Sequence, residues 1–216
     1  MAAAGCGSGS SRSSDTDTGS DTGTSPDTDA DSGKDAGSDT DTASDTGSDT
    51  DTGTGDFAVT DRVEFTTTMG TFVVGLYGND APITVQNFLT YVDEGFFDGL
   101  VFHRVIPSFM IQGGGYDKNL IPKATHPAIS LEIVKGLSHQ PGVISMARET
   151  APNTATSQFF ICVTDDSYLD GDYAAFGDTL SGYDVVKAIS KVTTKTVGVF
   201  KNVPVEPVII TSAVRL

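Results

Sequence analysis

The sequence predicts a mainly β protein, a closed or nearly closed antiparallel barrel capped by two α-helices. Three observations predict it. Most apolar residues fall in short runs bounded by Gly, Pro or polar residues. Only two segments space their apolar residues as a helix does. Val, Ile, Leu, Phe and Tyr occur only after residue 56, so residues 57–216 are expected to form one domain with its own core.

Residues 1–56 are expected to be a disordered, acidic tail. They contain no Val, Ile, Leu, Phe, Tyr or Trp, and cannot bury enough apolar surface to offset the entropy of ordering. Thirteen Asp against Arg12 and Lys34 give this segment a net charge of −11 out of the chain's −16. The sequence Gly-Ser-Asp-Thr recurs three times, which is typical of an extended spacer. Calcium binding by the alternating aspartates is the alternative, but a dedicated site needs a fixed loop and a strong closing carboxylate.

The first residues resemble the end of a bacterial lipoprotein signal. Ala-Ala-Gly precedes Cys6, and a Ser/Gly run follows. Cys6 is therefore a candidate for lipidation and membrane attachment, and an extracytoplasmic location in a bacterial envelope is expected. The hydrophobic region of such a signal is missing from the given sequence. A start further upstream, a truncated chain and a chance match all stay open, and so does a cytoplasmic location.

Composition excludes several classes of function for residues 57–216. Their net charge of −5 argues against nucleic-acid binding, which favours a basic face. Cys162 lies in an apolar run and is expected to be a buried small residue, so no disulfide framework follows. The three histidines lack the spacing of metal ligands: His103, His126 and His139. No metal or organic cofactor is expected, and nothing requires more than a monomer.

The elements follow from the hydrophobic pattern. Residues 63–68 and 71–77 flank Met69-Gly70 and predict a β-hairpin with a tight turn. Helical spacing then appears at Val85, Phe88, Leu89 and Val92, and Gly95 ends this first helix.

Short apolar runs after residue 100 predict further strands, at residues 101–106, 109–112, 142–146 and 158–163. A second helix is expected after Gly182, with an apolar side formed by Val185, Val186 and Ile189. Residues 207–214 alternate enough for a last strand.

One arginine stands among apolar and aromatic residues in the segment FHRVIPSFMIQGGG, residues 102–115. An isolated cation on an apolar strand is costly, so Arg104 is expected to have a specific role. A second segment, SQFF at residues 157–160, places Gln158 beside two phenylalanines. Together they predict an apolar pocket with polar groups at its rim. The alternative is a structural Arg104 whose stem packs while its guanidinium binds a loop carbonyl.

Both segments resemble the cyclophilin family of peptidyl-prolyl cis-trans isomerases, especially its bacterial members. The similarity covers residues 59–214 and includes MGTFVVGLYGNDAPITVQNFLTYV at 69–92, GVISMARE at 142–149 and FGDTLSGYDVVKAI at 176–189. It implies an eight-stranded antiparallel closed barrel capped by two α-helices. It also implies an enzyme that rotates Xaa-Pro bonds in proline-containing peptides and in unfolded or folding proteins, and so assists protein folding.

The resemblance also implies roles for individual residues. Arg104 corresponds to the catalytic arginine. The proline pocket would be formed by Phe109, Met110, Phe160 and Leu169. Hydrogen bonds to the peptide would come from the side chains of Gln112 and Gln158 and from the backbone of Ala147 and Arg148.

Two aromatic residues depart from the eukaryotic pattern. Tyr168 stands where many eukaryotic members carry tryptophan, and Tyr173 where they carry histidine, so both are expected to contact substrate. Weak binding of the drug cyclosporin is expected because of Tyr168. Two other classes of function stay open: a peptide-binding or chaperone-like module with little catalysis, and a surface adhesin or scaffold whose partner recognises the acidic tail.

Overall fold

A computed structural model of the protein describes residues 57–216. The predictions of a disordered spacer and of a lipidated Cys6 lie outside the described residues. The elements, in chain order, are β1 (Asp61–Thr67), β2 (Gly70–Leu76), α1 (Pro82–Asp93), β3 (Arg104–Ile106), β4 (Met110–Gly113), β5 (Val143–Met146), β6 (Phe159–Cys162), the 3₁₀ helix η1 (Ser167–Leu169), β7 (Ala175–Ser181), α2 (Tyr183–Ser190), β8 (Thr194–Val197), β9 (Phe200–Pro204) and β10 (Ile210–Arg215).

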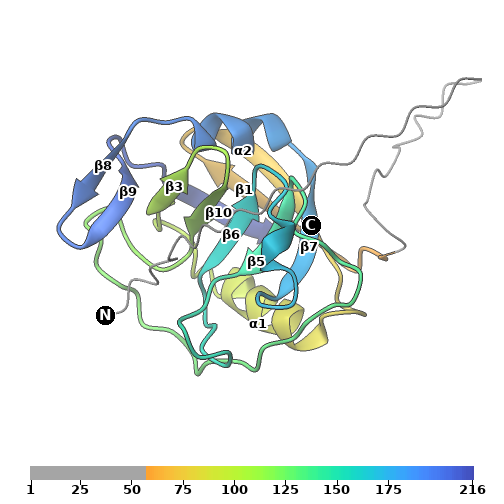
Figure 1. The fold of residues 1–216 in the computed structure, drawn as a ribbon. Helices are drawn as coiled ribbons and strands as arrows, with labels where there is room; N and C mark the ends of the chain where they lie inside the picture. The colour runs from red at the N-terminus through yellow and green to blue at the C-terminus, as the bar shows by residue number, and fades with distance from the viewer. Residues whose placement is uncertain (1–56) are drawn as a thin grey trace, which may run out of the picture. The chain divides into compact units, whose positions relative to one another are not determined.

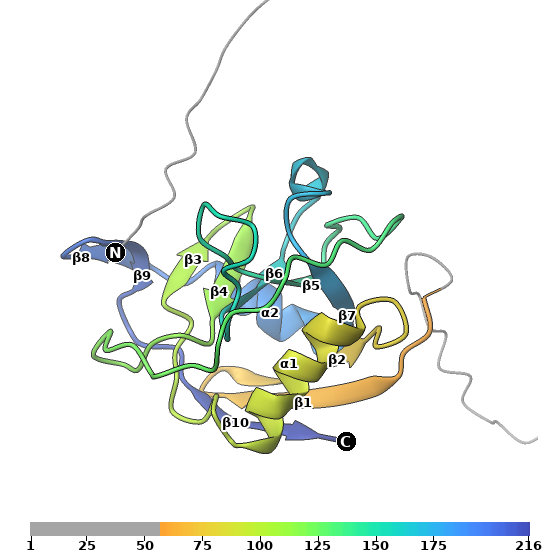
Figure 2. The same cartoon turned by 90° about the horizontal axis from the view of Figure 1, so that it is seen from below.

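Eight strands form one antiparallel sheet, in the order β10-β1-β2-β7-β5-β6-β4-β3. Strands β8 and β9 pair separately as a hairpin, and β9 packs beside β3. The two helices lie at opposite ends of the curved sheet, α2 at the top of Figure 1 and α1 at the bottom. The view from below shows α1 in front of α2 (Figure 2). The mainly β fold with two capping helices is therefore confirmed.

The prediction of a closed barrel was slightly overstated, because the sheet forms a half-barrel whose edge strands β10 and β3 are not joined by a ladder. A few backbone bonds link the segment before β3 to the start of β10 and the residues just before it. The Phe102 N–H donates to Val208 O at 3.0 Å, and the Ile210 N–H donates to Leu100 O at 2.8 Å. Strand β3 is only 3 residues long, since Pro107 follows it and lacks an N–H to extend the ladder.

Aromatic side chains fill the space between the sheet and α1. The Phe65 ring stacks on Phe72 across the β1–β2 hairpin, with ring centroids 5.1 Å apart. Phe88 of α1 meets Phe159 of β6 edge to face at 5.6 Å. All four side chains are buried, so the helix is held chiefly by apolar burial.

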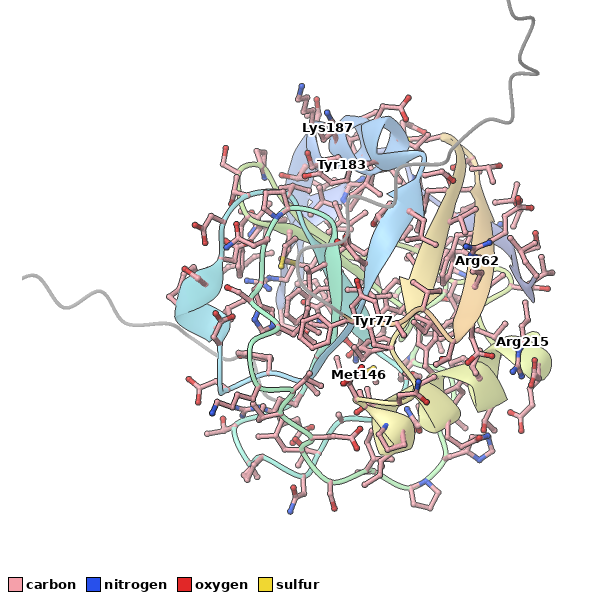
Figure 3. All side chains as sticks on the ribbon, turned by 90° about the vertical axis from the view of Figure 1, so that its right-hand side faces the viewer. Arg62, Tyr77, Met146, Tyr183, Lys187 and Arg215 are labelled. Carbon is pink, nitrogen blue, oxygen red and sulfur yellow. The ribbon has the colours of Figure 1, made fainter. Side chains whose placement is uncertain are left out.

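Side-chain placement on the remaining elements follows the same division (Figure 3). Tyr77 and Met146 point into the molecule, whereas Lys187 of α2 projects from the surface. Arg215, near the end of β10, pairs with Asp61 of β1 and lies 3.8 Å from an Asp93 carboxylate oxygen of α1. No helix within residues 57–216 combines the length and apolar character needed to cross a bilayer.

The predicted hairpin, both helices and the strands at β4, β5, β6 and β10 are confirmed, with small shifts at their ends. Residues 101–103 of the predicted third strand make only an isolated bridge, at Val101. Four elements were not predicted: β7, the two strands of the β8–β9 hairpin and η1. Strand β7 reads AFGDTLS, in which glycine and polar residues hide the alternation.

Gly177 in β7 should be among the least replaceable residues of the sheet. A Cβ there would lie 2.2 Å from the backbone oxygen of Gly75 on β2, which cannot move without breaking the ladder. We expect Gly177→Ala to lower the free energy of unfolding by about 3 kcal/mol or more, measured by urea denaturation. Gly171→Ala is the control, because its φ of +82° is strained for alanine but no atom lies within 4 Å. It should cost about 1 kcal/mol. Equal losses would contradict the steric argument.

Candidate active site

Four neighbouring strands carry two parallel rows of side chains that face opposite ways. The strands are β3, β4, β6 and β5, and the pairing register places residues directly opposite one another. One row packs into the main core: Val105, Ile111, Ile161 and Ile144. Because successive side chains of a strand point to opposite faces, the adjacent row faces away from that core. This outer row is Arg104, Gln112, Phe160 and Ser145.

Polar side chains at the start of the outer row form a hydrogen-bonded chain. The Arg104 Nη1 donates to Gln112 Oε1 at 3.2 Å. Gln112 Nε2 in turn donates to Gln158 Oε1 at 3.0 Å. These bonds fix the orientation of both amides and hold the guanidinium over the sheet. The two glutamines predicted at the rim therefore lie beside Arg104.

Arg104 is a cation whose side chain is partly buried. Burial lowers the pKa of Arg104, while the nearby Tyr173 and Tyr168 act in the opposite direction. An arginine stays protonated in proteins even so. Its Cζ lies 5.8 Å from the centroid of the Phe109 ring, within reach of a cation–π contact. The site thus presents a fixed positive charge next to an apolar surface.

An apolar cluster separate from the main core adjoins Arg104. Its buried members are Met110, Phe160, Cys162 and Leu169. Partly buried residues packed against them are Ile106, Phe109, Ala147 and Tyr173. All four residues predicted for the proline pocket therefore belong to one cluster. Tyr168 is 64% exposed and lies at its edge, with its ring 6.1 Å from that of Phe109.

Arg148 has a structural role that the sequence did not reveal. Its Nε donates to Asp172 O at 2.8 Å, its Nη1 donates to Glu149 O at 2.9 Å, and its guanidinium lies 4.8 Å from the Tyr173 ring centroid. The side chain therefore joins two loops beside the pocket. The Ala147 N–H donates to Gln158 O at 2.9 Å. Backbone pairing of Ala147 and Arg148 with a peptide stays a prediction.

Three polar residues that were not predicted lie behind the pocket. The His139 ring is hydrogen-bonded to Asp170 through Nδ1 and to Ser145 through Nε2, and it lies nearly parallel to the Phe160 ring. The one sequence signal was a serine in the apolar strand VISM. His139 and Asp170 are 31 residues apart in loops, where no periodicity relates them.

His103 and Cys162 are buried and fit structural roles. The pKa of His103 is lowered to about 4, chiefly by burial and secondly by the positive charge of Arg104. A hydrogen bond with the Val101 backbone acts to raise it, but is outweighed. His103 is therefore neutral at pH 7. Its Nδ1 has no hydrogen-bond partner among residues 57–216, and its ring packs on Tyr116 at 4.7 Å. Burial raises the pKa of the Cys162 thiol, which keeps it protonated and unreactive.

No cluster of three or more His, Cys, Asp or Glu side chains within residues 57–216 is suited to hold a metal ion. A cavity of about 220 Å³ lies apart from the candidate site, lined by residues that include Lys118, Lys195 and Val203. None of the residues of the outer row or the apolar cluster lines it. The candidate site is therefore identified by the strand register and by the hydrogen-bonded side chains of Arg104, Gln112 and Gln158, and not by this cavity.

Comparisons with known proteins agree with this geometry. The family model described as cyclophilin type peptidyl-prolyl cis-trans isomerase/CLD matches residues 62–215. A peptidyl-prolyl cis-trans isomerase of Acinetobacter baylyi is 47% identical over 155 residues, which cover 69% of this chain and 82% of the relative. Peptidyl-prolyl cis-trans isomerase B of Escherichia coli is 43% identical, covering 69% and 96% of the two chains. A Cryptosporidium parvum cyclophilin type isomerase, solved in the presence of the dipeptide Ala-Pro, superimposes with a TM-score of 0.62 at 26% identity, over 71% of this chain and 97% of its own.

The buried His103 should make stability depend on pH. Its folded pKa of about 4 lies below the usual 6.5, so the unfolded chain binds more protons between these values and stability falls as pH falls. We expect His103 to lower the free energy of unfolding by about 2 kcal/mol between pH 6.5 and pH 5. Urea denaturation at both pH values measures it, with His103→Asn as the comparison. Identical pH dependence in the two proteins would contradict this account.

Proposed function

The chain belongs to the cyclophilin family of peptidyl-prolyl cis-trans isomerases, and from that premise we propose that Arg104 donates a hydrogen bond to the prolyl nitrogen as the peptide bond twists. The protein is an isomerase that acts on Xaa-Pro peptide bonds. In our proposal Met110, Phe160 and Leu169 hold the proline ring while the residue before it rotates.

The chemistry requires a donor that acts only near the transition state. Rotation about the amide faces a barrier of about 18–20 kcal/mol, because resonance gives the C–N bond double-bond character. In the twisted state the nitrogen becomes pyramidal and regains its lone pair, which can then accept a hydrogen bond. The planar ground state cannot accept it. A guanidinium that makes this bond therefore lowers the barrier instead of only tightening binding.

Arg104 alone is too weak to supply the whole effect. A charge-assisted hydrogen bond contributes about 1.5–3 kcal/mol. The uncatalysed reaction takes roughly 10–100 s, and a 10⁵-fold acceleration would require about 7 kcal/mol in total. The rest must come from holding the proline in the apolar pocket and from a polar environment arranged in advance.

The observation that carries the proposal is the Arg104–Gln112–Gln158 chain beside the apolar cluster. The guanidinium bond of 3.2 Å and the amide bond of 3.0 Å place three side chains before any peptide arrives. Arg148, which joins two loops, donates its hydrogen bonds to backbone carbonyls. Arg104 instead bonds another side chain at the pocket edge, which favours catalysis over a pure binding module.

Proline-containing segments of unfolded or folding proteins are the proposed substrates. We propose an extracytoplasmic site of action, supported by the Ala-Ala-Gly-Cys sequence that ends at Cys6 and by the polar composition of residues 1–56. A lipid on Cys6 with such a spacer would leave the isomerase domain free to reach clients near a membrane. Mass spectrometry of the protein expressed in a bacterial host tests for the lipid.

The catalytic role of Arg104 is tested by the cis-to-trans exchange rate of an Ala-Pro peptide, followed by NMR. We expect the protein to accelerate exchange and Arg104→Ala to lower kcat/KM by about 10- to 150-fold, the value of one charge-assisted hydrogen bond. Arg62→Ala is the matched control, because Arg62 is an exposed arginine of β1 outside the site. Circular dichroism verifies that each variant is folded.

Two outcomes would contradict the proposal in different ways. If the parent protein binds the peptide without accelerating exchange, the domain is a binding module. If Arg104→Ala is as active as Arg62→Ala, the isomerase assignment stands and another group stabilises the twisted bond.

Tyr168 should limit cyclosporin binding. Its ring is largely exposed and meets Phe109 at 6.1 Å, so a larger indole at this position would extend the apolar edge of the pocket. We expect weak binding by the parent protein and about tenfold tighter binding by Tyr168→Trp, a change of about 1.4 kcal/mol, measured by calorimetry. Tyr168→Phe keeps the ring size and should bind as the parent does. No gain with Trp would show that another residue limits the affinity.

A further inference from the structure

A buried histidine connects two parts of the pocket through hydrogen bonds. The His139 side chain is 1% exposed, and its Nδ1 lies 2.6 Å from Asp170 Oδ1. Its Nε2 lies 3.0 Å from Ser145 Oγ on β5. Its ring is nearly parallel to that of Phe160, at 13°, with centroids 5.9 Å apart. His139 therefore lies behind the floor of the proline pocket.

Asp170 attaches the opposite wall of the pocket to this histidine. It is the residue that ends η1, the turn that carries Tyr168 and Leu169. Its Oδ1 also accepts the His139 backbone N–H at 2.9 Å, and its Oδ2 accepts the Ser138 hydroxyl at 2.6 Å. A second link joins the same segments, since the Asp166 N–H donates to His139 O at 2.8 Å. Leu169 and Phe160 are thus fixed relative to each other through His139.

The hydrogen-bond chemistry determines the roles of the two ring nitrogens. An ionised Asp170 only accepts, so His139 Nδ1–H is the donor in that bond. Burial acts to raise the pKa of Asp170, but hydrogen bonds from Ser138 and His139 outweigh it and the pKa is lowered, which keeps the carboxylate ionised. In the neutral imidazole, Nε2 then accepts the Ser145 hydroxyl proton.

Ser145, His139 and Asp170 have the order of a hydrolase triad, but they are not placed to act as one. Ser145 is fully buried at 0% exposure, and Phe160 of the neighbouring strand lies directly opposite it in the register. No substrate carbonyl can reach Ser145 Oγ. The arrangement therefore holds parts of the protein in position and carries out no chemistry of its own.

We propose that His139 and Asp170 are positioning residues for the isomerase, which set the separation between Phe160 and Leu169 and so the width of the proline pocket. The inference rests on the proposed function, because it concerns the same pocket. The Asp170 side chain is 37% exposed, so burial alone does not require its bonds to His139. An exposed carboxylate that fixes a buried ring and the end of a short turn is placed to define geometry.

Loss of this link should weaken substrate binding more than it slows the chemical step. The pocket contacts the proline ring in the planar and the twisted states alike, so a change in its width alters KM with little effect on kcat. Removal of Arg104, by contrast, acts on kcat. A rise in KM without a change in kcat separates a positioning role from a general loss of stability. A variant that is only less stable would show the parent's KM and kcat in the molecules that remain folded.

The test compares three substitutions in the full chain, with KM and kcat for an Ala-Pro peptide measured well below each melting temperature. Asp170→Ala removes the acceptor of three hydrogen bonds, and we expect KM to rise about fivefold with kcat within about twofold of the parent. Asp170→Asn keeps an oxygen acceptor and should restore most of the affinity. Asp172→Ala is the matched control and should match the parent, because the exposed Asp172 side chain makes none of these bonds and alanine keeps the backbone oxygen that accepts from Arg148.

A second variant tests the inference independently, in case Asp170→Ala does not fold. His139→Phe keeps a flat ring against Phe160 but removes both polar bonds, and should raise KM as Asp170→Ala does. If the folded variants retain the parent's KM, the inference is overturned while the isomerase function stands. If neither folds, the network serves folding and the inference is also overturned. If the parent protein itself does not accelerate exchange, the proposed function fails and the inference with it.

Discussion

The pairing register of β3, β4, β6 and β5 is the constraint on which both the core and the site depend. Alternation along each strand sends Val105, Ile111 and their row into the core, and sends Arg104, Gln112 and Phe160 to the other face. A slip of one residue would bury the arginine and expose the isoleucines. The core therefore enforces the register, and the register in turn aligns the side chains of the outer row.

In the site, the hydrogen bonds between polar side chains and the partial burial of Arg104 support each other. Partial burial lowers the pKa of Arg104 and removes water that would screen its charge. Burial of a cation is unfavourable unless hydrogen bonds compensate for the lost water. Here the Gln112 side chain accepts such a bond from Arg104. Gln112 is itself held by Gln158 from a neighbouring segment. The groups that would orient a peptide thus also make the buried charge tolerable.

Local patterns in the sequence predicted those elements whose residues alternate or recur clearly. The β1–β2 hairpin and α1 have strong apolar periodicity, and both formed as expected. Strand β7 and the β8–β9 hairpin were missed, because Gly177 and a run of Thr and Lys residues replace the apolar pattern. Closure of the barrel was overstated, since it depends on long-range pairing between chain segments around residues 101 and 209, which no local pattern encodes.

The same limit applies to the site. Arg104 and Gln158 were visible as polar residues in apolar runs, and the structure brings them together through Gln112. Individual roles came from the resemblance to cyclophilins, because roles depend on contacts with a substrate. His139 and Asp170 gave no signal, since no periodicity relates two loop residues 31 positions apart.

The most direct test of this account is a crystal structure of the protein with an Ala-Pro peptide bound. We expect the proline ring against Met110, Phe160 and Leu169, with the Arg104 guanidinium facing the prolyl nitrogen at about 3–3.5 Å, close enough to donate once the bond twists. A peptide seated elsewhere, or a prolyl nitrogen out of reach of Arg104 with the proline in the pocket, would contradict it.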